Sequence, residues 1–141
     1  MTKTREPYIK ELELLAENHF PVYDFFNSIR KASFNRIYED FSNGIGAGIE
    51  CAICSFPDDL LSSGIHPSEV PNGISFSIQV FYDDNVVLDY STFYYYLNIA
   101  YKRHIEMYPD TEHELTKLLE ETKHTLENLN GAPLQQITPI N

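Results

Sequence analysis

Cysteine and histidine are the first candidates for chemistry, because their side chains bind metals and transfer protons. Cys51 and Cys54 have the C-x-x-C spacing of zinc and thiol redox motifs. They lie in a stretch that alternates like a β-strand, where positions three apart point to opposite faces. No second cysteine pair or nearby histidine pair completes a zinc site. We therefore interpret both thiols as small buried hydrophobic groups and predict no metal site.

Histidine and glycine patterns suggest no catalytic site either. The five histidines, at positions 19, 66, 104, 113 and 124, form no H-E-x-x-H spacing. The glycines at 44, 46 and 48 precede a predicted strand, whereas a phosphate-binding loop leads into a helix. We expect no enzymatic activity, no catalytic residue and no cofactor. The alternative is a small acidic enzyme, which would require a cleft where His104, Asp89 and Tyr101 converge.

The charge distribution restricts the possible partners. The 141 residues include 21 acids and 10 bases, for a formal net charge of −11. No Lys or Arg occurs between Arg36 and Lys102, so the middle of the chain is purely acidic. Such a surface repels nucleic-acid phosphates and anionic lipids. We expect a basic protein partner, with no direct nucleic acid and no membrane, although solubility alone explains an acidic surface equally well.

Tyrosines accompany these acids, with six between positions 82 and 104. Tyrosine is enriched at protein interfaces. By helical geometry Tyr94 and Tyr95 point away from the core, and partial cover by the last helix is the alternative to a binding role. The predicted partner-binding residues are Asp58, Asp59, Glu69, Tyr82, Asp83, Asp84, Tyr94 and Tyr95. If they fail, the helices around Glu39 and Asp40 are the next candidates.

The periodicity of the apolar residues predicts the elements that position these side chains. Helical spacing covers about 6–17 and 21–31, and a third helix starts with Ser33 as its N-cap and stops at Asn43-Gly44. Alternation then predicts one strand over 45–54 and another over 74–82, separated by an exposed connection. A turn at 83–85 leads into a third strand, 86–90, and forms a hairpin.

Two helices complete the predicted order. Ser91 is the expected N-cap of the first, whose apolar stripe contains Phe93, Leu97, Ala100 and His104. Thr111 and Glu114 predict a capping box for the last helix, which ends at Gly131. The resulting class is α+β, with N-terminal helices, a small antiparallel sheet and two C-terminal helices packed on it. We expect one domain over 1–131 and a loose tail over 132–141.

Two segments carry a resemblance to a known family: HFPVYDFFNSIRKASFNRIYEDFSNGIGAGIECAICSFPDD and GISFSIQVFYDDNVVLDYSTFYYYLNIAYKRHIEMYP. They resemble immunity proteins of bacterial contact-dependent growth inhibition systems, specifically those that protect against ribonuclease toxins. The likeness covers roughly residues 8–125 and rests on the aromatic helix, the GIGAGIE turn and the strand, acidic turn and tyrosine-rich helix.

The resemblance implies a non-catalytic cytoplasmic protein that binds the C-terminal nuclease domain of a toxin. The lack of an apolar signal segment near the start and of a long apolar run leads to the same expected location. Because ribonucleases attract phosphate, an acidic inhibitor fits independently. A nucleic-acid mimic that inhibits another basic protein is a further alternative.

Overall fold

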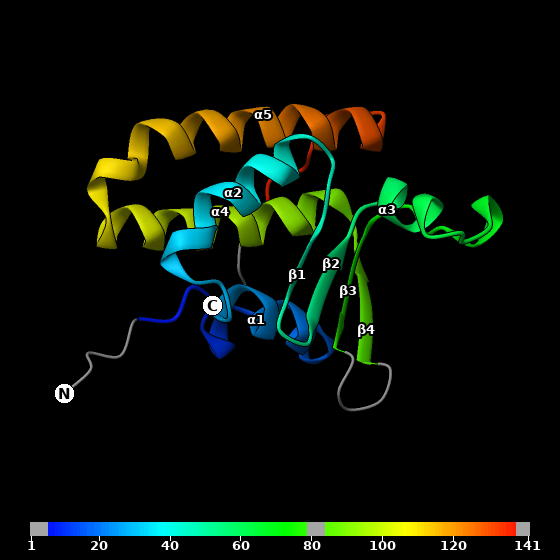
Figure 1. The fold of residues 1–141 in the computed structure, drawn as a ribbon, viewed down its shortest axis with the longest axis horizontal. Helices are drawn as coiled ribbons and strands as arrows, with labels where there is room; N and C mark the ends of the chain where they lie inside the picture. The colour runs from blue at the N-terminus through cyan, green and yellow to red at the C-terminus, as the bar shows by residue number, and fades with distance from the viewer. Residues whose placement is uncertain (1–5, 79–83, 138–141) are drawn as a thin grey trace.

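The computed structural model describes residues 6–78 and 84–137. Within these ranges, the chain forms helices and one four-stranded antiparallel sheet of order β1-β2-β3-β4. The sheet lies at one end of the helices (Figure 1). The elements are α1 (Phe20–Asn27), α2 (Lys31–Ser42), β1 (Ala47–Ile49), β2 (Ala52–Ser55), α3 (Pro57–Ser62), β3 (Ile74–Ile78), β4 (Asp84–Leu88), α4 (Tyr90–Met107) and α5 (Glu112–Asn130). This arrangement confirms the predicted α+β class.

The predicted helix over 6–17 is wrong. Two short 3-10 turns, Glu11–Glu13 and Glu17–His19, replace it. The side chain of Asn27 accepts hydrogen bonds from the backbone N–H groups of Tyr8 at 2.7 Å and Ile9 at 3.1 Å, and it donates to the Ile9 carbonyl. These bonds satisfy backbone groups that a helix would otherwise pair internally, so residues 6–17 pack on the domain without forming an α-helix. We call this segment the N-terminal strap.

The next two helices have different boundaries from those predicted. Helix α1 ends at Asn27, where the Ser28 hydroxyl donates to the carbonyl of Asp24. Arg30 then adopts an extended conformation and α2 starts at Lys31, so Ser33 lies inside the first turn and is not its cap. Gly44, in the left-handed region with φ 73°, follows the end of α2 as predicted.

The predicted single strand over 45–54 is a two-stranded hairpin. Ile49 pairs with Ala52, which leaves Glu50 and Cys51 as the connecting turn. Glu50 has φ 53°, a left-handed conformation that a non-glycine residue rarely adopts and that alternation alone does not signal. The turn also places Cys51 on the surface, so the prediction of two buried thiols holds only for Cys54.

The second predicted hairpin is confirmed by the antiparallel pairing of β3 with β4. The predicted turn at 83–85 is wrong for its last two residues, because Asp84 and Asn85 are strand residues that pair with Ile78 and Ser77. The connection between β2 and β3, which was predicted to be exposed, contains the short helix α3 and a 3-10 turn, Pro67–Glu69. Most of that connection is exposed.

One face of the sheet packs on the helices through Phe76 of β3. Its ring centroid lies 5.5 Å from that of Phe25 in α1 and 5.8 Å from that of Phe93 in α4. Helix α4 also contacts β4, whereas α5 packs mainly on α2 and α4. The aromatic core therefore lies between the sheet and the helices and fixes the sheet by one face only.

The predicted apolar stripe of α4 is confirmed: Phe93, Leu97, Ala100 and His104 are all buried. The cap of this helix is Asp89, whose carboxylate accepts from the backbone N–H of Thr92 at 2.8 Å, and not Ser91 as predicted.

The capping of α5 also differs from the prediction at its start. Thr111 makes no side-chain cap bond, because its hydroxyl donates back to the Tyr108 carbonyl. Gly131, with φ 71°, ends α5 as expected. Beyond it Leu134 packs against the core, and the backbone N–H of Gln135 donates to the Ser91 hydroxyl.

Candidate functional site

The two neighbouring acids of α3 have different surroundings. Asp58 is exposed, whereas the carboxylate of Asp59 accepts from the backbone N–H groups of Gly46 at 2.8 Å and Phe56 at 2.7 Å. Asp59 therefore joins the start of β1 to the start of α3. Of this predicted pair, Asp58 presents its charge to solvent and Asp59 has a structural role.

The other predicted acids lie at two ends of the sheet. Glu69 is exposed in the connection that leaves β2 after Ser55. Asp84 begins β4 and pairs with Ile78, and Ile78 in turn pairs with Ala52 at the far end of β2. Three strand residues, about 10 Å, separate these ends. Tyr82 and Asp83 lie outside the described residues, so the structure does not place them.

Tyr94 and Tyr95 lie side by side in sequence on the face of α4 away from its buried stripe. With Ile99 they line a groove of about 720 Å³, which Lys123 of α5 and the segment 134–137 also border. Both tyrosines are partly buried and pack against the core. The structure therefore agrees with the alternative considered for these two side chains, that other parts of the protein partly cover them.

Helix α5 packs on α4 and brings carboxylates near Tyr94. Burial raises the pKa of its hydroxyl, and the nearby carboxylates of Glu120 and Glu127 raise that pKa further. The hydroxyl of Tyr95 donates weakly, at 3.4 Å, to the backbone carbonyl of Glu13. The predicted tyrosines thus form a groove separate from the acids of α3.

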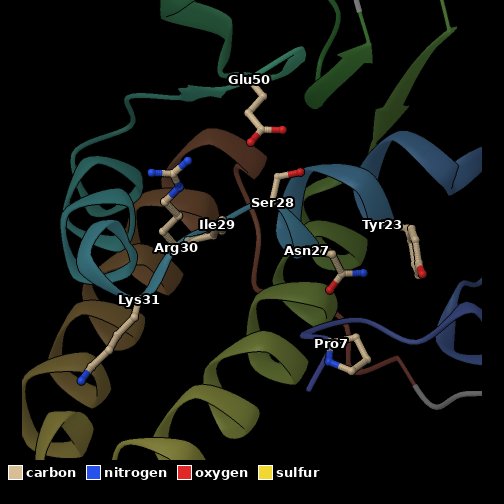
Figure 2. A pocket seen from close by; sticks show the side chains of 8 residues that line it. All are labelled: Pro7, Tyr23, Asn27, Ser28, Ile29, Arg30, Lys31 and Glu50. Atoms are coloured by element: carbon tan, nitrogen blue, oxygen red, sulfur yellow. The ribbon is translucent and has the colours of Figure 1, made fainter. Parts of the chain in front are cut away.

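A second hollow, of about 630 Å³, lies between the loop after α1 and the β1–β2 turn (Figure 2). Its lining includes Tyr23, Asn27, Arg30, Lys31 and Glu50. The side chains shown in Figure 2 carry charges of both signs, and no histidine is among the lining residues. This lining offers hydrogen-bonding and ion-pairing groups but no nucleophile with an adjacent base.

The residues required for the alternative enzyme do not converge. His104 is 1% exposed, its Nδ1 lies 2.8 Å from the Tyr8 hydroxyl, and its ring stacks on Phe34 with centroids 3.9 Å apart. Asp89 caps the start of the same helix, 15 positions earlier in the sequence and about 22 Å away along the helix axis. Across residues 6–78 and 84–137, no group of three or more His, Cys, Asp or Glu side chains could hold a metal ion.

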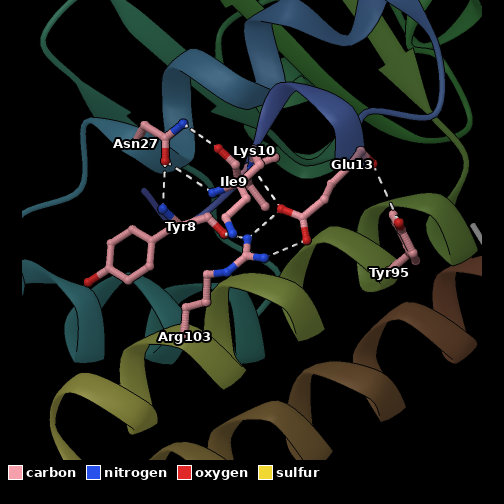
Figure 3. A network of polar contacts seen from close by, with 7 residues as sticks. All are labelled: Tyr8, Ile9, Lys10, Glu13, Asn27, Tyr95 and Arg103. Atoms are coloured by element: carbon pink, nitrogen blue, oxygen red, sulfur yellow. Dashed lines mark hydrogen bonds and ion pairs between the residues drawn. The ribbon is translucent and has the colours of Figure 1, made fainter. Parts of the chain in front are cut away.

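Sequence reasoning missed the polar network that fixes the N-terminal strap on α4 (Figure 3). Arg103 forms an ion pair with Glu13 and donates to the backbone carbonyl of Tyr8 at 2.7 Å. The Tyr96 hydroxyl accepts from the backbone N–H of Leu15 at 2.8 Å. Burial raises the pKa of Tyr96 to about 12, so this hydroxyl stays protonated at neutral pH. No sequence pattern pairs Arg103 with Glu13, because 90 positions separate them and Lys102 beside Arg103 carries the same charge.

Comparison with known proteins complements this geometry. A family model described as CDI immunity protein, where CDI stands for contact-dependent growth inhibition, matches residues 13–119. No curated protein matches the chain. In the described part of the chain, no helix is long and apolar enough to cross a membrane. The matched range includes both sheet hairpins, α4 and the first part of α5, most of the fold described above. The chain therefore belongs to the CDI immunity protein family.

Proposed function

We propose that this protein binds and neutralises the C-terminal nuclease domain of a contact-dependent growth inhibition toxin, and that the nuclease is a ribonuclease. Membership of the family gives the general role, immunity against such toxins. The observation that carries the finer proposal is the segment 37–101, which contains no Lys or Arg. A nuclease needs a positive surface for its phosphate substrate, and an acidic protein is complementary to that surface.

The proposed mechanism is occlusion without catalysis. An immunity protein that covers the substrate path of the toxin excludes RNA by occupying the same basic side chains. Long-range attraction between opposite charges raises the association rate, which matters when a toxin enters a cell that must survive it. We place this inhibition in the cytoplasm, where RNA is the target. The partner is thus a basic protein, and the immunity protein itself acts neither on nucleic acid nor on membranes.

The acids and tyrosines predicted from sequence remain the proposed contacts. Asp58 and Glu69 are exposed and have no role in the backbone geometry described above, which supports a role in attraction. Tyr94 and Tyr95 border a groove and supply aromatic area at low entropic cost. Tyr82 and Asp83, which lie outside the described residues, and Asp84, the first residue of β4, stay in the proposal as predicted from sequence, and Asp59 contributes through the position of α3.

The test is co-expression with the C-terminal domain of the cognate toxin. We expect the two proteins to copurify, the domain alone to degrade RNA and arrest growth, and the immunity protein to prevent both effects. Copurification without protection, or an immunity protein that leaves RNA cleavage unchanged at saturating concentration, would refute the proposed inhibition.

The acidic contacts need a charge-matched control. Asp58→Ala combined with Glu69→Ala removes two exposed charges, and Asp110→Ala combined with Glu121→Ala removes two from elsewhere. We expect only the first pair to slow association with the toxin domain. Equal association rates for the two double variants would exclude Asp58 and Glu69 as contacts.

A further inference from the structure

The sheet has one face with no helix packed on it in the described structure. Register places two rows of paired residues there: Gly48, Ile53, Ser77 and Asn85 in one, and Ser55, Ser75 and Val87 in the other. All seven are exposed or half-buried, whereas the alternate residues in β2 and β3 are buried. We call these seven residues the open face.

The chemistry of the open face is unusual for a solvated sheet. An antiparallel sheet can leave one face in water, and that face is then commonly polar. Here none of the seven residues is charged, and three of the four strands contribute a serine or glycine. Such short side chains leave the backbone accessible and give a low, even surface. Val87 adds an apolar side chain that is 48% exposed.

Strand β4 is also an edge of the sheet. Edge strands usually avoid pairing with other chains by means of lysine, proline or a bulge. Apart from Asp84 at its start, β4 reads Asn-Val-Val-Leu, with no charge and no proline. An exposed edge of this kind can pair with strands of other chains and cause aggregation unless a partner covers it.

Acidic residues occur in the sequence at both ends of the sheet. Glu50 is exposed in the β1–β2 turn and Asp84 is in the adjacent end of β4, while Asp58 and Glu69 lie in the connection at the other end of β2. The whole sheet falls within the base-free segment, so its strands carry no positive side chain. The charge pattern is therefore complementary to a basic protein and unfavourable for nucleic acid or for a second copy of this chain.

We infer that the open face, together with the edge of β4, is the main surface that contacts the basic toxin domain, and that the groove lined by Tyr94 and Tyr95 is a secondary contact. This inference rests on the proposed function and specifies its binding surface. The face supplies a flat, uncharged centre where desolvation costs little, and the acids at both ends of the sheet supply attraction and orientation. The open face also extends from the end of the sheet near Glu50 and Asp84 to the end near Asp58 and Glu69, so a single partner can contact the acids at both ends.

The experiment uses the whole protein and the inactivated C-terminal domain of the cognate toxin. Ser77→Arg and Val87→Arg each place one large positive side chain on the open face. His113→Arg makes the same charge change at an exposed site near the start of α5, away from the sheet (Figure 1). We expect Ser77→Arg and Val87→Arg to lower affinity for the toxin domain at least about tenfold, and His113→Arg to bind like the wild type.

Hydrogen exchange of the unmodified protein supplies a readout that does not depend on how the variants fold. Toxin binding is expected to slow exchange of the amides in β4. If the wild type binds but exchange slows only around the α4–α5 groove, or if both open-face variants are folded and bind within about twofold of the wild type, the inference is wrong and the immunity role stands. A wild-type protein that neither binds nor protects would instead refute the proposed function.

Discussion

Arg103 and Glu13, 90 residues apart in sequence, form an ion pair that holds the N-terminal strap against α4 (Figure 3). A second hydrogen bond from the same guanidinium reaches the backbone carbonyl of Tyr8. Both side chains of the pair are about three-quarters buried, with 21% and 24% exposure. Because both partners are largely buried, this pair has more influence on stability than a fully exposed ion pair would.

Replacing Arg103 tests that role. We expect Arg103→Ala to lower the free energy of unfolding by about 1–3 kcal/mol, because it removes the ion pair with Glu13 and the hydrogen bond to the Tyr8 carbonyl. Arg36→Ala, at an exposed position of α2, is the control and should change stability by less than about 0.5 kcal/mol. Urea denaturation measures both. Equal stabilities for the two variants would show that the ion pair contributes nothing.

The contribution of Glu13 should depend on pH. Burial raises the pKa of its carboxyl, but hydrogen bonds from Arg103 and from the Lys10 backbone outweigh burial, and the pKa lies below the ordinary 4.5. A lowered folded-state pKa means that the stabilisation is complete above the ordinary value and is lost as pH falls through the folded-state value. The stability difference between wild type and Glu13→Gln should therefore shrink between about pH 6 and about pH 3. A difference that stays constant over this range would contradict the ionic role.

Asp58 and Asp59 should respond differently to replacement. Asp59→Ala removes the acceptor for two backbone N–H groups and is expected to cost about 1–3 kcal/mol. Asp58→Ala should leave stability within about 0.5 kcal/mol of the wild type. Thermal unfolding separates the two variants. Matching losses of stability would mean that Asp59 does not hold the start of α3.

The two thiols should differ in reactivity. Cys51 is exposed in the β1–β2 turn, whereas burial, with a smaller effect of the Asp59 carboxylate, raises the pKa of Cys54 far above its ordinary value. Only a thiolate reacts quickly with a disulfide reagent. We expect one thiol per native chain to react, the second only on unfolding, and Cys51→Ser to remove the fast phase. Two fast thiols in the native protein would contradict the burial of Cys54.

Association with the toxin domain should slow as salt rises. Ions screen charges over about 8–10 Å at ordinary ionic strength, so the attraction between an acidic and a basic surface weakens. We expect the association rate constant to fall at least about tenfold between about 0.05 M and about 0.5 M salt, with a smaller change in dissociation. Stopped-flow mixing gives both rates. An association rate independent of salt would exclude electrostatic steering.

Local pattern and composition determined much of this protein. Alternation at Ile74, Phe76 and Ile78 predicted β3, and helical spacing at Phe93, Leu97 and His104 predicted the buried stripe of α4, because both periods follow from backbone geometry alone. The helix, strand and helix order that follows from them gave the α+β class. The base-free segment is a property of composition and required no structure.

Tertiary structure decided what alternation and spacing cannot encode. The apolar spacing of Tyr8, Leu12 and Leu15 suggested a helix. Instead, the Asn27 side chain accepts hydrogen bonds from the strap backbone, and the Leu12 side chain is 91% exposed. The left-handed Glu50 converts one alternating run into a hairpin and exposes Cys51.

The candidate site depended on the same distinction. Sequence identified acidic and tyrosine residues, but distance along a chain does not give distance in space. Pairing of Ile78 with both Ala52 and Asp84 determined which end of the sheet each acid occupies. The open face became visible only through that register, because its small residues have no distinctive composition. Its position opposite Phe76 results from long-range packing of the sheet on α1 and α4, which no local pattern specifies.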